Sequence, residues 1–520
     1  MRDHFRHSVS SLYASTDATA AKPDAGVYGD DEYDEFKDEK TSRWLNWFNG
    51  APGILLGTAV ALGLFALVEA VPSLKATLAT YIVGKNTYYI GVLYFRAMTC
   101  VGVPLAFTSI ALSVAAIVHA PKMVFVRVKM VWLIFVSTLL ATIQGMVWIW
   151  FFRDEIEGSE FVYREGLLTI LCPNSTKLVL PNGPAGTLTC MDAPSTAATA
   201  FLIGDDIFKI MSKISRYTHY RSNSSQVVHL ISDFAPNNVF NALFNNDVVA
   251  IVAFAVAFGV ATGMLSRSES GNIVMKVLRE FNLLLQTMSG YVAASTPVAI
   301  IPLILAPLLA GTHTMNLDML RLAYYLIAYA GVSLLHVGVV LPLILVLHAR
   351  GNPYMYFWRL KDAATYALGC SSSLKALPVT MRCVDREVSN PGIARFSLSV
   401  GTILNKNGAA IYLSMAFMWI FVNGGLSKEL TGTTVGVMVV CSLVGSTAVA
   451  PIRTGGVGIV VCLYTFVTGL PIPFAFAFLL VGEFLIDPIA TITNIAGNVV
   501  VAYVIAQKER KVDLFVDARP

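Results

Sequence analysis

The sequence predicts an all-α polytopic membrane protein with eight transmembrane helices and two re-entrant helical hairpins in inverted repeats. Hydrophobic residues make up 55% of its 520 residues and charged residues only 13%, whereas a soluble protein carries about 25% charged residues. The mean hydropathy is +0.64. Long apolar runs alternate with short polar segments along most of the chain. These three observations together indicate a chain that lies mainly within a lipid bilayer.

The same composition excludes several classes of protein. A chain with so few charges cannot cover a water-facing surface, so a soluble enzyme, a nucleic-acid-binding protein and a disordered chain are all poor interpretations. No nucleophile and base can be paired from the sequence, so we predict no enzyme and no cofactor. The seven cysteines include no CxxC pair, which argues against a zinc site.

The two ends of the chain are polar. Residues 1–47 are rich in acidic side chains, and we expect no secretory signal there. We interpret them as a disordered cytosolic tail, with a partner-binding acidic tail as the alternative. Residues 507–520 are predicted to form a second cytosolic tail.

The transmembrane spans are assigned by length. A helix needs about 20 apolar residues to cross a hydrocarbon core that is about 30 Å thick. Several runs exceed this length, which predicts steep tilt or breaks. The predicted spans are 52–72, 88–118, 126–151, 244–265, 275–310, 319–349, 393–424 and 472–506.

Basic residues near the span ends predict the orientation of the chain. Lys and Arg cluster in 122–129, 350–361 and 508–511, and such clusters favour the cytosolic side. Both termini are therefore expected in the cytosol, with an external loop at about 155–235. That loop carries glycosylation acceptor motifs at Asn174 and Asn223. It also carries Cys172 and Cys190, which could pair.

Two apolar stretches are interrupted in the middle by small and polar residues. They are 355–385, broken at Gly369–Ser373, and 430–470, broken at 449–456. Their halves are too short to cross the bilayer, so each stretch is predicted to be a re-entrant hairpin.

Each hairpin precedes a long span that contains an Asn/Gly cluster, at 405–408 and at 494–498. We predict that both clusters interrupt their helices. A hairpin plus a broken helix, repeated in opposite orientation, is typical of an inverted repeat with a binding site at the midplane. The alternative is a channel or a scaffold with irregular helices.

Three segments resemble the glutamate and neutral amino acid transporters, the dicarboxylate/amino acid:cation symporters. Residues 371–383 resemble the serine-rich first hairpin of that family, and 394–412 its seventh helix with the motif Asn-Met-Asp-Gly-Thr. Residues 487–498 resemble the eighth helix, and 96–110 also match. The resemblance runs from about residue 50 to residue 506 and indicates a divergent eukaryotic member.

The resemblance implies a homotrimer in which a transport domain slides like an elevator against a trimerisation scaffold. Residues 48–125 and 152–318 would then form mainly the scaffold. The transport domain would comprise 126–151 and 319–506, namely the hairpin 355–385, the broken helix 393–424, the hairpin 430–470 and the last helix 472–506.

Asp487 lies within an apolar helix, where a charge costs about 2.5–3.5 kcal/mol on insertion scales and usually serves a function. By resemblance, this carboxylate would hold the amino group of an amino acid substrate. The alternative is a helix-end carboxylate that faces a lysine. The hairpin serines would bind the substrate carboxylate, and Ser373 is the best match. The predicted substrate-binding residues are Ser371, Ser372, Ser373, Arg453, Asp487, Ala490, Thr491 and Asn494.

Ala490 stands where members that carry acidic substrates have an arginine for the side-chain carboxylate. An unmatched carboxylate would be penalised there, so a small neutral amino acid is favoured. Arg453 and Lys375 could overturn this preference by supplying the lost charge, which leaves an acidic amino acid or another organic anion as the alternative. Either could instead be a solvated side chain at a hairpin tip.

The positions that match cation sites depart from the family. Asn407 and Asn498 replace two aspartates that bind sodium in the family, and Lys406 replaces a methionine. Hard cations prefer anionic or carbonyl oxygen, so sodium affinity should fall. We hypothesise that Lys406 acts as a tethered cation, donating to Asn405, Asn407 or carbonyls of the broken helix. Transport would then be independent of sodium, as an exchange or coupled to protons.

Ser137 and Thr138 match hydroxyls that help to form a sodium site. Their presence supports the alternative that sodium still binds at a remaining site while Lys406 extends into water. No confident metal site is therefore predicted.

Three functions remain open from the sequence. They are a secondary amino acid carrier, an anion channel that conducts chloride between scaffold and carrier, and a sensor or scaffold that does not transport. The expected location is the plasma membrane, and the expected partners are a small-molecule substrate, lipid and further copies of the chain. No nucleic acid partner is expected.

Overall fold

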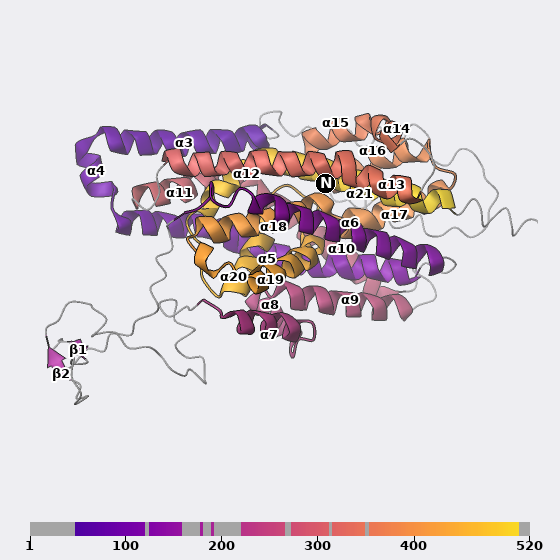
Figure 1. The fold of residues 1–520 in the computed structure, drawn as a ribbon, viewed down its shortest axis with the longest axis horizontal. Coiled ribbons are helices and arrows are strands. Elements are labelled where there is room, and N and C mark those ends of the chain that lie inside the picture. The colour runs from indigo at the N-terminus through magenta and orange to yellow at the C-terminus, as the bar shows by residue number, and fades with distance from the viewer. Residues whose placement is uncertain are drawn as a thin grey trace, which may run out of the picture.

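The computed structural model describes residues 47–119, 124–158, 177–179, 189–191, 220–265, 272–310, 315–348 and 353–508. The described chain is mostly helical, with long helices packed side by side (Figure 1). The prediction of an all-α architecture is confirmed at this level. The predicted tails lie almost wholly outside the described residues, and so does Asn174.

One set of helices packs around α5 and is called the α5 group. It comprises α3 (Ala51–Ala70), α5 (Tyr81–His119), α9 (Val248–Met264), α10 (Ile273–Ala294) and α11 (Thr296–Leu309). Helix α5 contacts α9, α10 and α11, and α3 packs on α11. The short helix α4 (Pro72–Leu78) joins α3 to α5.

The predicted span 275–310 is two helices, α10 and α11, which meet at an angle of 51°. Pro297 stands in the first turn of α11. A proline has no backbone N–H to donate within a helix, and it is favoured in the first turn, where that donor is not needed. The length of the run 275–310 predicted steep tilt or a break. The structure has a break at Ser295, between α10 and α11.

A second set of helices is called the α18 group. It comprises α6 (Val124–Trp150), α12 (Met315–Leu335), the π-helix η5 (His336–Val340), α13 (Leu341–His348), α14 (Pro353–Arg359) and α15 to α21. Helix α18 (Asn407–Asn423) packs on α6, and α12 and α17 (Pro391–Leu404) pack on α21 (Phe476–Lys508). The groups meet where α20 contacts α5 and α21 contacts α3.

Both predicted hairpins are present. The first consists of α15 (Lys361–Cys370) and α16 (Ser373–Asp385), and the second of α19 (Gly432–Ala448) and α20 (Val457–Thr468). At 1.5 Å per residue, arms of 10, 13, 17 and 12 residues fall short of the about 30 Å needed to cross a bilayer. The two helices of each hairpin pack on each other, and their re-entrant path within the membrane stays a prediction.

The seventh predicted span is broken as expected, because α17 ends at Leu404 and α18 begins at Asn407. The prediction that the last span is also interrupted is wrong. Helix α21 runs without a break from Phe476 to Lys508. Its asparagines bond to a neighbouring helix instead of to their own backbone, as described below.

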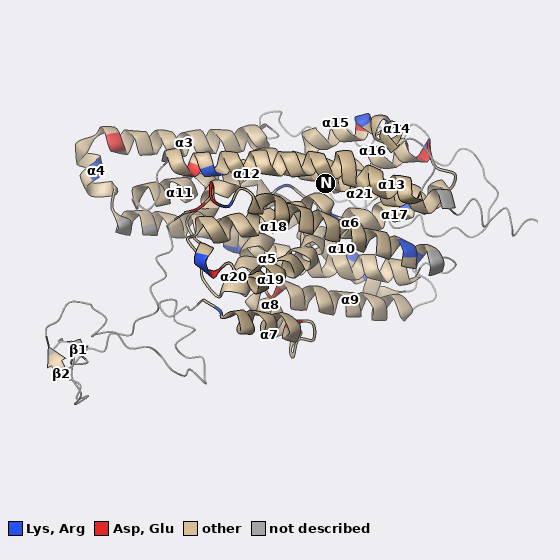
Figure 2. Cartoon of the chain, viewed as in Figure 1, with Lys and Arg blue, Asp and Glu red and all other residues tan. Residues whose placement is uncertain are grey.

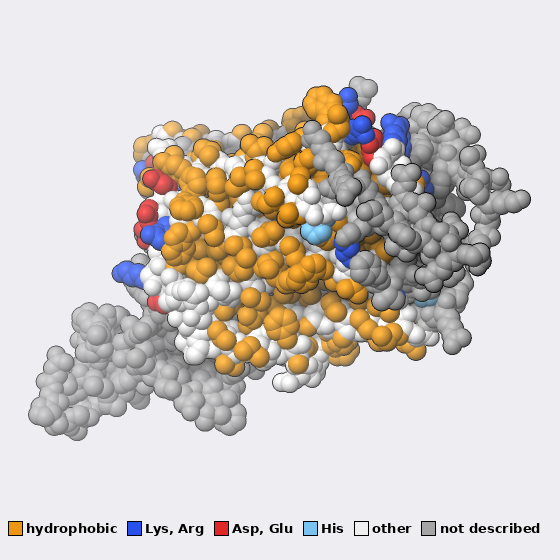
Figure 3. Space-filling model, turned by 45° about the vertical axis from the view of Figure 1, so that its right-hand side comes forward, with side chains coloured by type: hydrophobic (Ala, Val, Ile, Leu, Met, Phe, Trp, Pro, Cys, Tyr) orange, Lys and Arg blue, Asp and Glu red, His pale blue; other side chains and the backbone are white. Residues whose placement is uncertain are grey.

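Among the described residues, five helices are long and apolar enough to cross a membrane, or six if α10 and α11 form one bent span. Eight were predicted. The count differs because α9 has only 17 residues and the seventh span is divided into α17 and α18. Figure 2 shows the described acidic and basic residues mainly toward the two ends of the helices, and Figure 3 shows hydrophobic side chains in a broad band between them. This is the surface of an integral membrane protein.

The predicted external loop is described only in part. Its strands β1 (Lys177–Val179) and β2 (Thr189–Met191) pair antiparallel, and Cys190 on β2 is disulfide-bonded. Its predicted partner, Cys172, lies outside the described residues. The last part of the predicted loop contains helix α7 (Asn223–Asp233), and the Oδ1 of Asn223 accepts a hydrogen bond from Thr434. The short helix α8 (Val239–Asn245) follows.

Candidate substrate and cation site

The two hairpin tips contact each other. Ser372 ends the first tip, where its hydroxyl caps α16 by accepting from the amide of Lys375 at 3.4 Å. The same hydroxyl donates to the carbonyl of Pro451 in the second tip at 2.7 Å. Ser371 adopts a left-handed conformation with φ of 48°, which is rare for a residue with a side chain. Ser371, Ser372 and Ser373 are all buried, so this serine tip lies inside the protein.

Asp487 holds the second hairpin tip. Its Oδ2 accepts a hydrogen bond from the backbone amide of Thr454 at 2.9 Å, and Thr454 is also left-handed, with φ of 55°. One turn later on α21, Thr491 donates to the backbone carbonyl of Asp487 at 2.8 Å. The carboxylate is thus bonded to the second tip, which in turn contacts the first tip through Ser372 and Pro451.

Helices α21 and α18 come very close at Ala490. A Cβ added to Gly408 would lie 2.3 Å from the carbonyl oxygen of Ala490, so only glycine fits at position 408. Asn494, one turn further along α21, accepts from the amides of Gly408 and Ala409 at 2.8 and 3.3 Å. Its side-chain oxygen therefore caps the start of α18.

The cation-site equivalents lie together. Ser137 Oγ on α6 is 3.0 Å from Asn405 Oδ1 and 3.4 Å from Asn407 Oδ1. Thr138 Oγ1 is 3.4 Å from each of these two oxygens. All four residues are buried. The cluster offers neutral oxygen only, because it consists of hydroxyl and amide side chains.

Asn498 is on α21, and its side chain lies against the C-terminal end of α17. With its amide oriented to satisfy its neighbours, its nitrogen donates to the carbonyls of Gly401 and Asn405 at 3.1 and 3.0 Å. The next residue toward the N-terminus, Gly497, leaves room for Asn407, because a Cβ there would come within 2.4 Å of Asn407 Nδ2. An aspartate at 498 could not donate to these carbonyls, whereas an amide can.

Lys406 is buried at the break between α17 and α18, with 2% of its surface exposed. Its ammonium donates to the carbonyl of Val449, the residue that ends α19. The C-terminal end of a helix carries partial negative charge, which favours a cation. The sequence predicted partners within the broken helix. The partner in the structure is instead Val449, the first residue of the second hairpin tip.

The two basic residues considered for an acidic substrate lie elsewhere. Arg453 Nη1 donates to the backbone carbonyl of Asn49, just before α3, at 3.1 Å. Lys375 is exposed on α16. The second tip also approaches the α5 group through Tyr94, whose hydroxyl lies 3.4 Å from Thr454 Oγ1. The hairpin tip thus bridges Asp487 on one side and the α5 group on the other.

Glu483 was not among the residues predicted from the sequence. It lies one turn before Asp487 on α21, is 2% exposed, and accepts a hydrogen bond from Tyr412 at 2.7 Å. The signal was available, because a second acidic residue within an apolar helix carries the same insertion cost that drew attention to Asp487.

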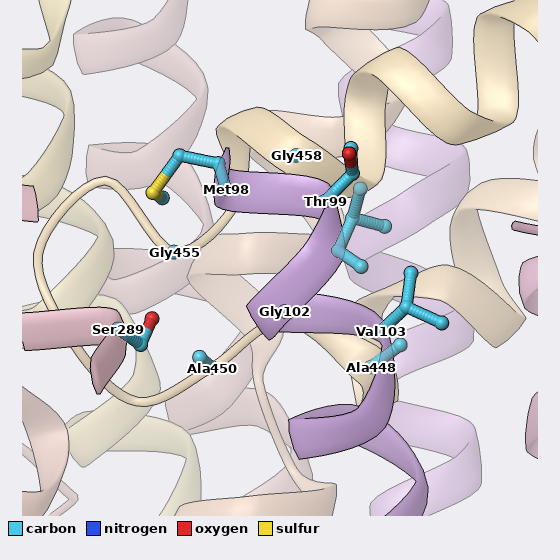
Figure 4. A pocket seen from close by; sticks show the side chains of 10 residues that line it. Met98, Thr99, Gly102, Val103, Ser289, Ala448, Ala450, Gly455 and Gly458 are labelled. Atoms are coloured by element: carbon cyan, nitrogen blue, oxygen red, sulfur yellow. The ribbon is translucent and has the colours of Figure 1, made fainter. Parts of the chain in front are cut away.

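A small crevice lies beside the second tip, between α5, α10 and the hairpin (Figure 4). Met98 and Gly102 of α5 line one side, and Ala450 and Gly455 of the tip line the other. The residues proposed to bind substrate or cation do not line it. This crevice is part of the contact between the α5 group and the hairpin.

The fold and the site together define a class of protein: a mostly helical polytopic membrane protein in which the tips of two helical hairpins meet beside the Asp487 carboxylate. A model of the sodium:dicarboxylate symporter family matches residues 186–508. This match covers more than half of the chain, and the chain therefore belongs to that family.

Several curated relatives are transporters. The neutral amino acid transporter B(0) of Homo sapiens is 28% identical over 256 residues, 48% of this chain and 46% of that protein. The putative sodium-dependent excitatory amino acid transporter glt-4 of Caenorhabditis elegans is 28% identical over 264 residues, 50% and 51% of the two chains. Excitatory amino acid transporter 2 of Rattus norvegicus is 27% identical over 253 residues, which are 48% of this chain and 43% of that protein. The chain spans about half the length of the curated relatives it matches.

Proposed function

We propose that this protein is a secondary active transporter that moves a small neutral amino acid across the plasma membrane. Family membership and the names of the relatives support amino acid transport. The observation that carries the proposal is Asp487, a carboxylate at membrane depth placed beside two buried hairpin tips. A carboxylate in such a place pairs strongly with an ammonium group. Ser371 to Ser373 and the tip amides would bind the substrate carboxylate.

A neutral side chain is favoured because position 490 is alanine and Arg453 is bonded to Asn49. A second carboxylate on the substrate would find no basic partner from these positions and would lose its hydration without compensation. The competing proposal is an acidic amino acid or another organic anion. It is favoured by one observation, namely that Arg453 lies close enough to Asp487 to act on its charge.

Sodium coupling is proposed to be lost or reduced, with Lys406 as the tethered cation. Its buried ammonium binds the carbonyl end of α19, and the Asn498 amide binds two carbonyls at the end of α17. Protein donors therefore occupy carbonyl oxygens that a hard cation would need. The oxygen cluster of Ser137, Thr138, Asn405 and Asn407 is where a remaining sodium ion would bind if this part of the proposal fails.

The mechanism is proposed to be an elevator in a homotrimer. The α18 group, which carries both hairpins and the broken helix, would be the moving transport domain. The α5 group would be the fixed scaffold, with both termini in the cytosol. The contacts of the second tip with Asn49 and Tyr94 are then contacts between a moving and a fixed part.

The test is uptake of radiolabelled amino acids into proteoliposomes that contain the purified protein, with sodium replaced by choline. We expect uptake or exchange that persists without sodium. The triple variant K406M/N407D/N498D should create sodium dependence, and K375M serves as a matched control because Lys375 is exposed. Uptake by the unaltered protein that is strictly proportional to sodium would overturn the proposal for Lys406.

Current is measured in the same preparation. Substrate-gated chloride current without accumulation or exchange would favour the anion channel over the carrier. Neither signal with any amino acid would favour a sensor or scaffold.

A further inference from the structure

Glu483 and Asp487 form a pair of carboxyl groups deep in the α18 group. They lie one turn apart on α21, and Glu483 is 2% exposed. Each has one partner that donates to it. Tyr412 on α18 donates to Glu483 at 2.7 Å, and the Thr454 amide donates to Asp487 at 2.9 Å.

The pair is surrounded mainly by tyrosines. Titratable or charged groups from the neighbouring elements interact electrostatically with one or both carboxyl groups. They are Tyr94 of α5, Tyr325 and Tyr329 of α12, Tyr412 of α18, and Arg453 of the second tip. Arg453 is bonded to Asn49, and Lys406 to Val449. The positive side chains nearest the site therefore have partners other than these two carboxyls.

Two carboxyl groups can hydrogen-bond to each other only if one of them carries a proton. A carboxylate has acceptors only, whereas a protonated carboxyl group also has one donor. Two like charges at this distance and depth would also repel each other strongly. One proton shared between the two carboxyl groups removes this repulsion and supplies the donor that can join them.

We propose that Glu483 and Asp487 bind one proton between them, and that the ammonium group of the substrate competes with this proton for Asp487. This inference rests on the proposed function, since it takes Asp487 as the partner of the amino group. When the ammonium binds Asp487, its positive charge stabilises both carboxylates in the ionised form. The proton of Glu483 then leaves to solvent, and no covalent bond forms or breaks.

The proposal predicts proton release on substrate binding. Binding of the amino acids that are transported is measured by calorimetry with purified protein at about pH 6 and about pH 8, and proton release by a pH dye in weak buffer. Displacement of one proton makes the affinity rise with pH by at most about tenfold per unit. We expect a rise of this kind and release of up to one proton per bound substrate.

The variant E483Q should bind substrate with an affinity that no longer depends on pH and should release no proton. Glutamine keeps the shape and the acceptor for Tyr412, so the variant should fold. E429Q is the matched control, because Glu429 is exposed at the end of the short 3-10 helix Ser427–Glu429, and it should behave like the unaltered protein. Y412F keeps both carboxyls and should still release a proton, which tests the proposal if E483Q does not fold.

Equal pH dependence in E483Q and the unaltered protein would overturn the proposal. So would proton release of zero from a protein that binds substrate. Infrared spectroscopy separates this failure from failure of the proposed function. The stretching band of a protonated carboxyl group should be present in the ligand-free protein and absent in E483Q. If no amino acid binds at either pH, the transporter proposal fails, and the band alone decides whether the pair holds a proton.

Discussion

Removal of the Asn494 side chain should destabilise the protein through α18 as well as weaken any contact with substrate. Asn494 Oδ1 accepts from the amides of Gly408 and Ala409 at 2.8 and 3.3 Å. Leaving a buried amide without an acceptor costs about 1–3 kcal/mol. The second bond is longer and therefore weaker, so we expect N494A to lower the free energy of unfolding by about 2–4 kcal/mol in total.

The measurement is unfolding in mixed detergent and SDS micelles, followed by tryptophan fluorescence, because Trp419 is fully buried in α18. T493A is the matched control. Thr493 is the preceding residue, is equally buried, and donates only to the carbonyl of Ile489 on its own helix. That carbonyl keeps its helical amide partner, so T493A should cost about 1 kcal/mol or less.

A difference between N494A and T493A of less than about 0.5 kcal/mol would refute the reasoning. Changes of stability within about 0.5 kcal/mol are typical of substitutions that remove no specific interaction. If N494A instead loses only substrate binding and keeps its stability, Asn494 acts on the substrate alone. The cap seen in the structure would then contribute nothing measurable.

Two further predictions concern packing and pH. G497A should lower the free energy of unfolding by about 1–3 kcal/mol, because the added methyl would come within 2.4 Å of Asn407 Nδ2; G436A, where the same atom meets nothing within 4 Å, should change it much less in the same micelles. Burial and the neighbouring Asp247 raise the pKa of Asp233, at the end of α7, from 3.8 to about 6. The folded protein then binds a proton that the unfolded chain has lost, so stability should fall as pH rises from about 4 through about 6. The unfolding midpoint at about pH 5 should exceed that at about pH 7.5, and D233N should reduce the difference; an unchanged difference would contradict the assignment.

Local interruptions of the apolar pattern could be predicted from the sequence. The tips at 371–372 and 449–456 fall where small residues and proline interrupt apolar runs, because such residues favour a break in a helix. The break at Asn405 was found by the same reasoning. The cluster of Ser137 with the asparagines was predicted by resemblance, and the structure places these side chains together.

Features that depend on partners distant in the sequence could not be predicted. The Asn/Gly cluster at 494–498 looks locally like a break, but Asn494 and Asn498 bond to the neighbouring broken helix, and α21 continues through them. The direction of Arg453 depends on Asn49, which only the fold brings near. The partner of Lys406, Val449, lies on another element for the same reason. Glu483 could have been found, because its burial in an apolar helix is visible in the sequence.

The contact between Lys406 and Val449 has an energetic consequence. A sodium ion that binds from solution is released after each crossing, so its concentration gradient can drive a substrate uphill. A lysine ammonium is covalently attached and returns with the protein. If it takes the place of sodium, it can hold the second hairpin closed, but it adds no work to the transport cycle. A carrier built in this way can only equilibrate or exchange its substrates unless a different mobile ion supplies the driving force.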